Sequence, residues 1–151
     1  MESFPAGVFL DYAARKLEQL SGRIQDCLGR LPEGELWRRG GEHENAAGNL
    51  ILHLCGNARQ WIGYGVGGLA DVRERDLEFA ARGGLSKAEL AAKLHTTMAE
   101  MIAIVRNFPP ERLAEKATIQ GYEQTKFEAL PGEDLGYYRH LSKQGHAEKT
   151  P

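Results

Sequence analysis

Residues 85–110, LSKAELAAKLHTTMAEMIAIVRNFPP, decide the fold of this 151-residue chain, because they read as one long helix with both ends marked. Ser86 and Glu89 form a capping box, in which each side chain accepts a hydrogen bond from the backbone amide of the other residue. Apolar residues then recur every three or four positions, and a pair of prolines ends the segment. The sequence therefore predicts an amphipathic helix over residues 86–107.

Two earlier segments show the same helical period. Residues 8–31 carry an apolar stripe with charged residues on the opposite side, and a Pro-Glu-Gly sequence follows them. Residues 45–62 begin at Asn45, a favourable N-cap, and end before a glycine-rich stretch. On a helical wheel, the predicted core stripe of this second helix consists of Leu50, Leu54, Ala58 and Trp61. Together, these patterns predict three long antiparallel helices.

A fourth helix of similar length is not predicted. Pro131 interrupts the segment that would form it, and a proline inside a helix costs about 3 kcal/mol. The segment allows short helices at about 123–130 and 133–141. We therefore expect residues 120–151 to be irregular or to form short helices.

Length and composition predict one globular domain over residues 1–151. The formal net charge of −2 shows no basic excess of the kind that marks nucleic-acid binding. No apolar run approaches the ~20 residues of a membrane span, and the N-terminal residues do not read as a secretory signal. Cys27 and Cys55 form no CxxC pair and are too few for a disulfide framework. We expect a cytoplasmic protein that binds neither nucleic acid nor membranes.

His53 is the candidate functional residue of the second helix. It lies beside the predicted core stripe, on a polar seam with Asn49, Asn57 and Gln60. A histidine at such a boundary either binds a metal or hydrogen-bonds a neighbour, and the helical pattern does not decide between the two. The chain has no P-loop, dinucleotide-binding, nucleophile-elbow or HExxH motif. The sequence therefore assigns no catalytic residue.

The segment HLCGNARQWI, residues 53–62, resembles the DinB-like superfamily of damage-inducible bacterial proteins. The resemblance continues through RERDLEF (73–79), the capped helix, IQGYE (119–123) and GEDLGYYRHLSK (132–143). It implies an up-and-down bundle of four helices that is often dimeric. For this chain we expect the all-α class: three long helices and a short irregular C-terminal region in place of the fourth.

The resemblance also implies a metal site of three histidines, with His53 from the second helix and two ligands from the last long helix. Only residues 124–131 separate the last two matching segments, and no histidine occurs between His95 and His140. We therefore expect an incomplete metal site, no cofactor, and a role in binding or oligomerisation, or a degenerate one. The alternative is a metal-dependent thiol transferase or hydrolase-like enzyme, with zinc or nickel on His53 and a small-molecule or thiol ligand.

Around His53, the predicted pocket rim consists of Asn57, Trp61, Arg73 and Asp76. Two interpretations of residues 73–76 stay open: a solvated loop, which their charge favours, or a rim whose arginine binds a substrate carboxylate or phosphate. Trp61 is expected to pack in the core rather than to contact a substrate. Because the missing helix would leave apolar faces uncovered, we expect either that the C-terminal region covers them or that the chain forms a homodimer.

Overall fold

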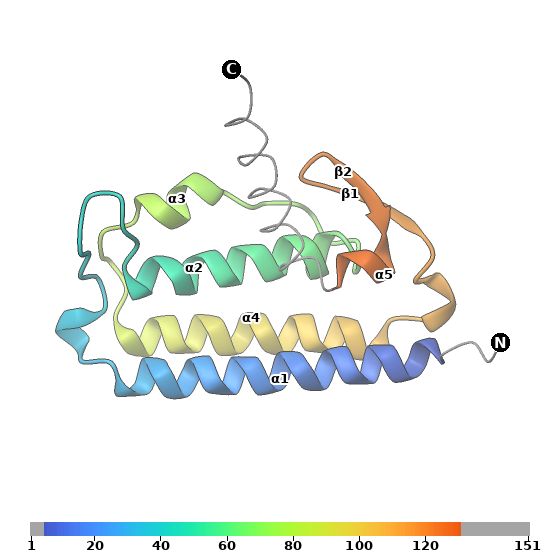
Figure 1. Cartoon of the computed structure of the whole chain (residues 1–151), viewed down its shortest axis with the longest axis horizontal. Coiled ribbons are helices and arrows are strands. Elements are labelled where there is room, and N and C mark those ends of the chain that lie inside the picture. Colours follow the sequence, from blue (N-terminus) through green and yellow to red (C-terminus); the bar gives the residue numbers. More distant parts are fainter. Residues whose placement is uncertain (1–4, 131–151) are drawn as a thin grey trace, which may run out of the picture.

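A computed structural model describes residues 5–130, which are mostly helical (Figure 1). The core consists of α1 (Ala6–Arg30), α2 (Ala47–Ala58) and α4 (Lys87–Asn107). α4 packs against both α1 and α2. The three predicted long helices are therefore confirmed, with boundaries that differ by a few residues.

α4 has the predicted architecture. Ser86 Oγ accepts from the Glu89 amide at 3.1 Å, and Glu89 Oε2 accepts from the Ser86 amide at 2.8 Å, so the capping box is present. Leu94 is only 1 % exposed, and α1 covers the same stripe with Leu10 and Leu28, each 4 % exposed. This apolar contact forms the centre of the molecule.

The second predicted helix differs in three respects. It starts one residue later than Asn45 indicates, and the Asn49 side chain, not that of Asn45, accepts a hydrogen bond from the Ala46 amide at 3.0 Å. After Ala58 it continues as a π-helical segment, η2 (Arg59–Tyr64). The predicted core stripe is wrong at Leu50, which is 48 % exposed, because the face toward α4 is instead formed by Ile51, Cys55, Ala58 and Ile62.

The connection between α2 and α4 corrects the predicted up-and-down order. Residues 65–86, which we call the return segment, run back along α2 and include α3 (Arg75–Ala80), so α2 and α4 run the same way (Figure 1). Gln60 donates to Asp71 at one end of this return segment (3.1 Å), and Asn49 donates to the Ala81 carbonyl at the other (2.8 Å).

The described chain ends with a small sheet that the all-α prediction did not include. β1 (Lys116–Ile119) and β2 (Tyr122–Thr125) pair antiparallel and are followed by α5 (Lys126–Ala129). The two turn residues, Gln120 and Gly121, have φ values of 52° and 80°, as a tight hairpin requires. The short helix predicted over 123–130 is therefore wrong in its first half, and the one predicted over 133–141 lies outside the described residues.

No helix within residues 5–130 has both the length and the apolar character needed to cross a membrane.

Candidate functional site

The return segment is attached to α2 through buried polar groups. Asn49 is fully buried; its amide donates to the carbonyls of Glu78 (3.0 Å) and Ala81 (2.8 Å). Its carbonyl accepts from Arg39 at 2.9 Å. Because a buried amide must find partners for all its polar atoms, these contacts fix α3 above the first half of α2. They bring Glu78 next to His53, one helical turn after Asn49.

His53 contacts two charged side chains through the same ring nitrogen. Its Nδ1 lies 3.2 Å from Glu78 Oε1 and 3.1 Å from Arg73 Nη2. Its ring stacks against Phe79 with centroids 4.9 Å apart. The side chains of His53, Glu78 and Arg73 are 30 %, 10 % and 4 % exposed, so this triad is largely shielded from solvent. We call these three residues the His53 triad.

The local environment keeps the imidazole neutral. Burial lowers the pKa of His53, and the positive charges of Arg73 and Arg75 lower it further. The hydrogen bond and charge of Glu78 act in the opposite direction but do not reverse the shift. Since the pKa of a free histidine is about 6.5, His53 is uncharged at neutral pH.

Arg73 is bound entirely inside the protein. Its Nε and Nη2 fork onto the two oxygens of Glu78 at 3.1 and 3.0 Å. Its Nη1 donates to Asn57 Oδ1 (3.1 Å) and Gln60 Oε1 (2.9 Å). Four of its five N–H groups thus have oxygen acceptors, and Nη2, which carries the fifth, also contacts His53 Nδ1. The solvated-loop interpretation is therefore wrong for Arg73, and no donor remains free for a substrate carboxylate.

The other predicted rim residues are spread over different environments. Asn57 is a partner of Arg73, and Trp61 is 4 % exposed within the hydrophobic core, as its packing role requires. Asp76 is exposed at the first turn of α3. Arg75, its neighbour, lies over the Phe79 ring with 5.2 Å between the guanidinium carbon and the ring centroid. Only Asn57 and Arg73 are thus close to His53.

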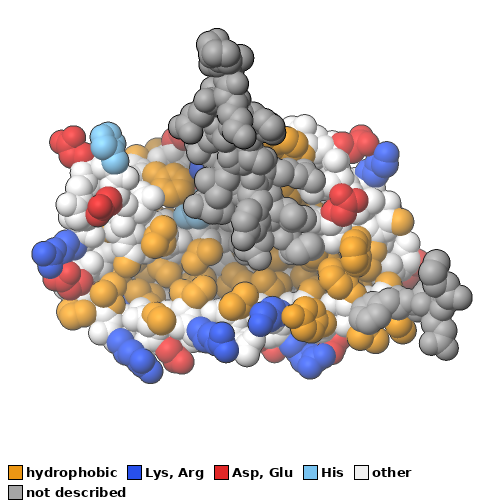
Figure 2. Space-filling view, viewed as in Figure 1, with side chains coloured by type: hydrophobic (Ala, Val, Ile, Leu, Met, Phe, Trp, Pro, Cys, Tyr) orange, Lys and Arg blue, Asp and Glu red, His pale blue; other side chains and the backbone are white. Residues whose placement is uncertain are grey.

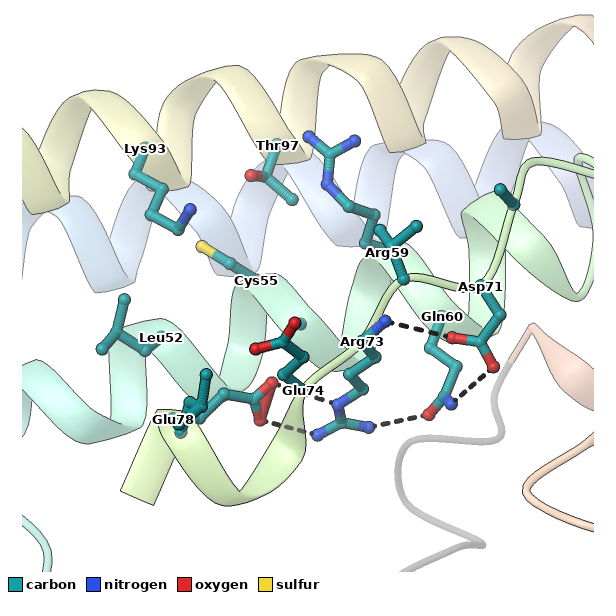
Figure 3. Close-up of a pocket in the computed structure, with 14 residues that line it drawn as sticks. Leu52, Cys55, Arg59, Gln60, Asp71, Arg73, Glu74, Glu78, Lys93 and Thr97 are labelled. Atoms are coloured by element: carbon teal, nitrogen blue, oxygen red, sulfur yellow. Dashed lines mark hydrogen bonds and ion pairs between the residues drawn. The ribbon is translucent and has the colours of Figure 1, made fainter. Parts of the chain in front are cut away.

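A cavity of about 490 Å³ lies on the other flank of α2, between the return segment and α4 (Figure 3). Sequence reasoning did not identify it. Arg73 and Glu78 separate it from His53, which does not line it. Its other main lining residues are Leu52, Cys55, Glu74, Leu77, Lys93 and Thr97.

The residues of the described chain do not fit the three-ligand metal site that the family resemblance implies. Zinc sites draw three or four ligands from His, Cys, Asp and Glu side chains. Within residues 5–130, no three such residues come together in a way that could hold a metal ion. His140 and His146, the other histidines near the C-terminus, lie outside the described residues. His53 therefore supplies one candidate ligand without described partners.

Comparison with protein-family models gives a match over most of the chain. The sequence model of a family described as Protein of unknown function (DUF1572) matches residues 5–144, which is nearly the whole chain. No curated protein is significantly similar to it.

Proposed function

This chain belongs to that uncharacterised family, and from this premise we propose that it is a DinB-like bundle that acts by self-association rather than through a bound metal. The DinB-like assignment is supported by the segment around His53 and by RERDLEF, residues 73–79, which supplies both other members of the His53 triad. The contact between Arg73 and His53 carries the proposal against a metal. From this contact we infer which imidazole nitrogen bears the proton.

The buried guanidinium needs an acceptor for each N–H group. Arg73 Nη2 has two hydrogens; Glu78 Oε1 takes one at 3.0 Å, and His53 Nδ1, at 3.1 Å, is the acceptor for the other. A neutral imidazole that accepts at Nδ1 carries its proton on Nε2. Nε2 then has no lone pair for a metal ion, so the triad supports a structural histidine.

An apolar surface on the flank of α2 opposite the cavity supports self-association. We call it the apolar seam; it consists of Leu17, Leu20, Ile24, Leu50 and Leu54. Leu20 is 42 % and Leu50 is 48 % exposed, and Figure 2 shows hydrophobic side chains gathered in a band between α1 and α2. Exposed apolar patches of this kind mark interaction surfaces.

A second copy of the chain is the partner that this surface fits. The helical period places Leu17, Leu20 and Ile24 on one flank of α1, while the charged Glu18 pairs with Arg106 of α4 on the other flank at 2.7 Å. The seam itself contains no charged side chain. Two-fold pairing brings identical patches together, and here it does so without like-charge repulsion.

The metal-dependent alternative has one supporting contact. Glu78 Oε1 lies 3.2 Å from His53 Nδ1, and metal-binding histidines usually donate their second N–H to a carboxylate. In that tautomer Nδ1 carries the proton and Nε2 is free for a thiol transferase or hydrolase metal such as zinc or nickel. The two proposals therefore predict opposite tautomers of His53.

Elemental analysis and nitrogen NMR of the ring distinguish them. For the metal-free bundle we expect substoichiometric zinc and nickel in the purified protein, no change in His53→Ala, and a proton on Nε2 in long-range ¹H–¹⁵N spectra. His95→Ala, an exposed histidine of α4, is the matched control. One equivalent of metal that is lost in His53→Ala and kept in His95→Ala would overturn the proposal.

Light scattering coupled to size exclusion tests self-association. The wild-type chain is expected to elute as a dimer, and Leu20→Glu or Leu50→Glu is expected to shift it to the monomer by placing a charge in the apolar seam. Val8→Glu, at a position equally exposed (48 %) but on the other flank of α1, is the control and should remain dimeric. A monomeric wild-type protein at micromolar concentration contradicts this part of the proposal.

A further inference from the structure

The cavity between the return segment and α4 contains two charged side chains without a hydrogen-bond or ion-pair partner among residues 5–130. They are the side chains of Lys93 on α4 and of Glu74 at the start of α3, and both line the cavity. In Figure 3 the ammonium of Lys93 and the carboxylate of Glu74 come from different walls and lie on either side of Cys55. The cavity thus presents one positive and one negative group.

The remaining charged residues of the cavity have hydrogen-bond or ion-pair partners among residues 5–130. Arg59 pairs with Glu100 at 3.0 Å, and Arg73 forks onto Glu78. Asp71 accepts from the Gln60 side chain at 3.1 Å. Lys93 and Glu74 are therefore the charged lining residues whose side chains have no partner among residues 5–130, while Asp71 keeps its negative charge because its partners are neutral amides.

The floor of the cavity is neutral and largely apolar. Cys55 and Thr97 are each 3 % exposed, and Leu52 and Leu77 contribute aliphatic walls. Burial raises the pKa of the Cys55 thiol, so this group is uncharged at neutral pH. An apolar pocket with a few polar groups at fixed positions is the usual form of a small-molecule site.

The volume suits a small ligand. At about 490 Å³ the cavity falls within the range of roughly 300–1,000 Å³ that is typical of ligand pockets. The π-helical segment η2 begins at Arg59 on its rim, and π-helical turns are frequent at functional sites.

We propose that this cavity binds a small zwitterion of the α-amino-acid class with an apolar side chain. Lys93 receives the carboxylate, Glu74 receives the ammonium group, and the Leu52–Leu77 walls receive the side chain. Opposite charges on the protein favour ligands that carry both groups, because a ligand with only one of them forms one ion pair instead of two. The site goes beyond the proposed self-association and does not involve the apolar seam, which lies on the opposite flank of α2.

Calorimetric titration of the full chain with three probes of the same carbon skeleton tests the charge requirement. L-Leucine carries both groups, 4-methylpentanoate only the carboxylate, and isopentylamine only the amine. Saturable binding of L-leucine is expected, with each single-charge probe at least tenfold weaker. No saturable binding of L-leucine, or equal affinity for either single-charge probe, would overturn the proposal.

Two variants assign the charges to residues. Lys93→Ala and Glu74→Gln are each expected to weaken L-leucine binding at least tenfold, and both positions are exposed, so folding should be retained. Lys16→Ala on α1 and Glu42→Gln, two exposed charges far from the cavity, are the matched controls and should bind as the wild type does. Wild-type affinity in Lys93→Ala or Glu74→Gln would refute the assignment. Repeating the titration in Leu50→Glu separates this result from the oligomeric state, since binding should be unchanged there even if self-association is lost.

Discussion

The α1–α4 pair and the α2–α3 pair are held together by different forces. α1 and α4 meet along a continuous apolar stripe, in which residues such as Leu90 and Val105 are fully buried. α3 is attached to α2 instead by buried polar groups: the amide of Asn49, the carboxylate of Glu78 and the guanidinium of Arg73. The apolar contact between α1 and α4 is non-directional, whereas the polar contact between α2 and α3 depends on the geometry of each hydrogen bond.

This difference matters for function because the polar contact between α2 and α3 positions the residues of both the His53 triad and the cavity. The Arg73–Glu78 pair holds His53 on one side. On its other side the same pair forms a wall of the cavity, as Figure 3 shows. A polar network in low-dielectric surroundings is stable only while all its members are satisfied. The α2–α3 pair should therefore respond to single substitutions very differently from the α1–α4 pair.

Removing one member of the ion pair is expected to give the largest effect. Arg73→Ala leaves the Glu78 carboxylate, which is 10 % exposed, without its counter-ion, and such a loss lowers the free energy of unfolding by about 3–5 kcal/mol. Chemical denaturation followed by circular dichroism measures this change.

Replacing both members provides the control. Arg73→Met combined with Glu78→Leu removes the two charges together, so the double variant should unfold within about 1–2 kcal/mol of the wild type. If the double variant is as unstable as Arg73→Ala, then lost packing rather than an uncompensated charge explains the loss, and the contrast between the two helix pairs fails.

In the apolar pair, truncation of a single core residue should have a comparable or smaller effect. Leu94 is 1 % exposed at the centre of α4, and Leu94→Ala is expected to lower the free energy of unfolding by about 2–5 kcal/mol. A second substitution should restore the stability of Leu94→Ala only if it fills the volume that the leucine side chain occupied. A loss below about 1 kcal/mol would show that this core repacks freely.

The apolar pair is also the part of the fold that could be predicted from the sequence. Periodicity and the capping box located α1 and α4 within two residues, because these signals are local and repeat along the chain. The hairpin was missed although Gln120-Gly121 lies in a short β-rich segment, since a four-residue strand carries too little periodicity to recognise. The direction of α2 relative to α4 was missed because it depends on the return segment, which has no long helix.

The candidate site was predicted only in part. The resemblance placed His53 and Arg73 in one region, and the structure brings them into contact. Glu78 lay within the same quoted segment, but a charged residue in a short helix gives no local sign that it is buried. The cavity combines α2, α4 and the return segment, so no single stretch of sequence could indicate it.

Gly56 offers a finer test of the polar pair. It lies in the middle of α2, where alanine is normally about 1 kcal/mol more favourable than glycine. A Cβ at this position would lie 1.9 Å from Glu78 Oε2, and Arg73 holds that carboxylate in place. Gly56→Ala should therefore destabilise the protein by about 1 kcal/mol instead of stabilising it. Gly22→Ala in α1, where the added Cβ meets nothing within 4 Å, is the matched control and should be stabilising.

The smallest expected effect is a dependence of stability on pH that comes from the His53 triad. Because the pKa of His53 is lowered on folding, the unfolded chain binds this proton more readily than the folded chain does. Stability is therefore highest above the pKa of about 6.5 of the unfolded histidine and declines as the pH falls below it. His53→Gln should flatten this decline between neutral pH and the onset of carboxylate protonation, as measured by thermal unfolding across the pH range. His95→Gln, at an exposed position on the apolar α1–α4 pair, should leave it unchanged. An unchanged slope in His53→Gln would mean that the imidazole does not lose its proton on entering the network, and that Glu78 rather than Arg73 determines its charge.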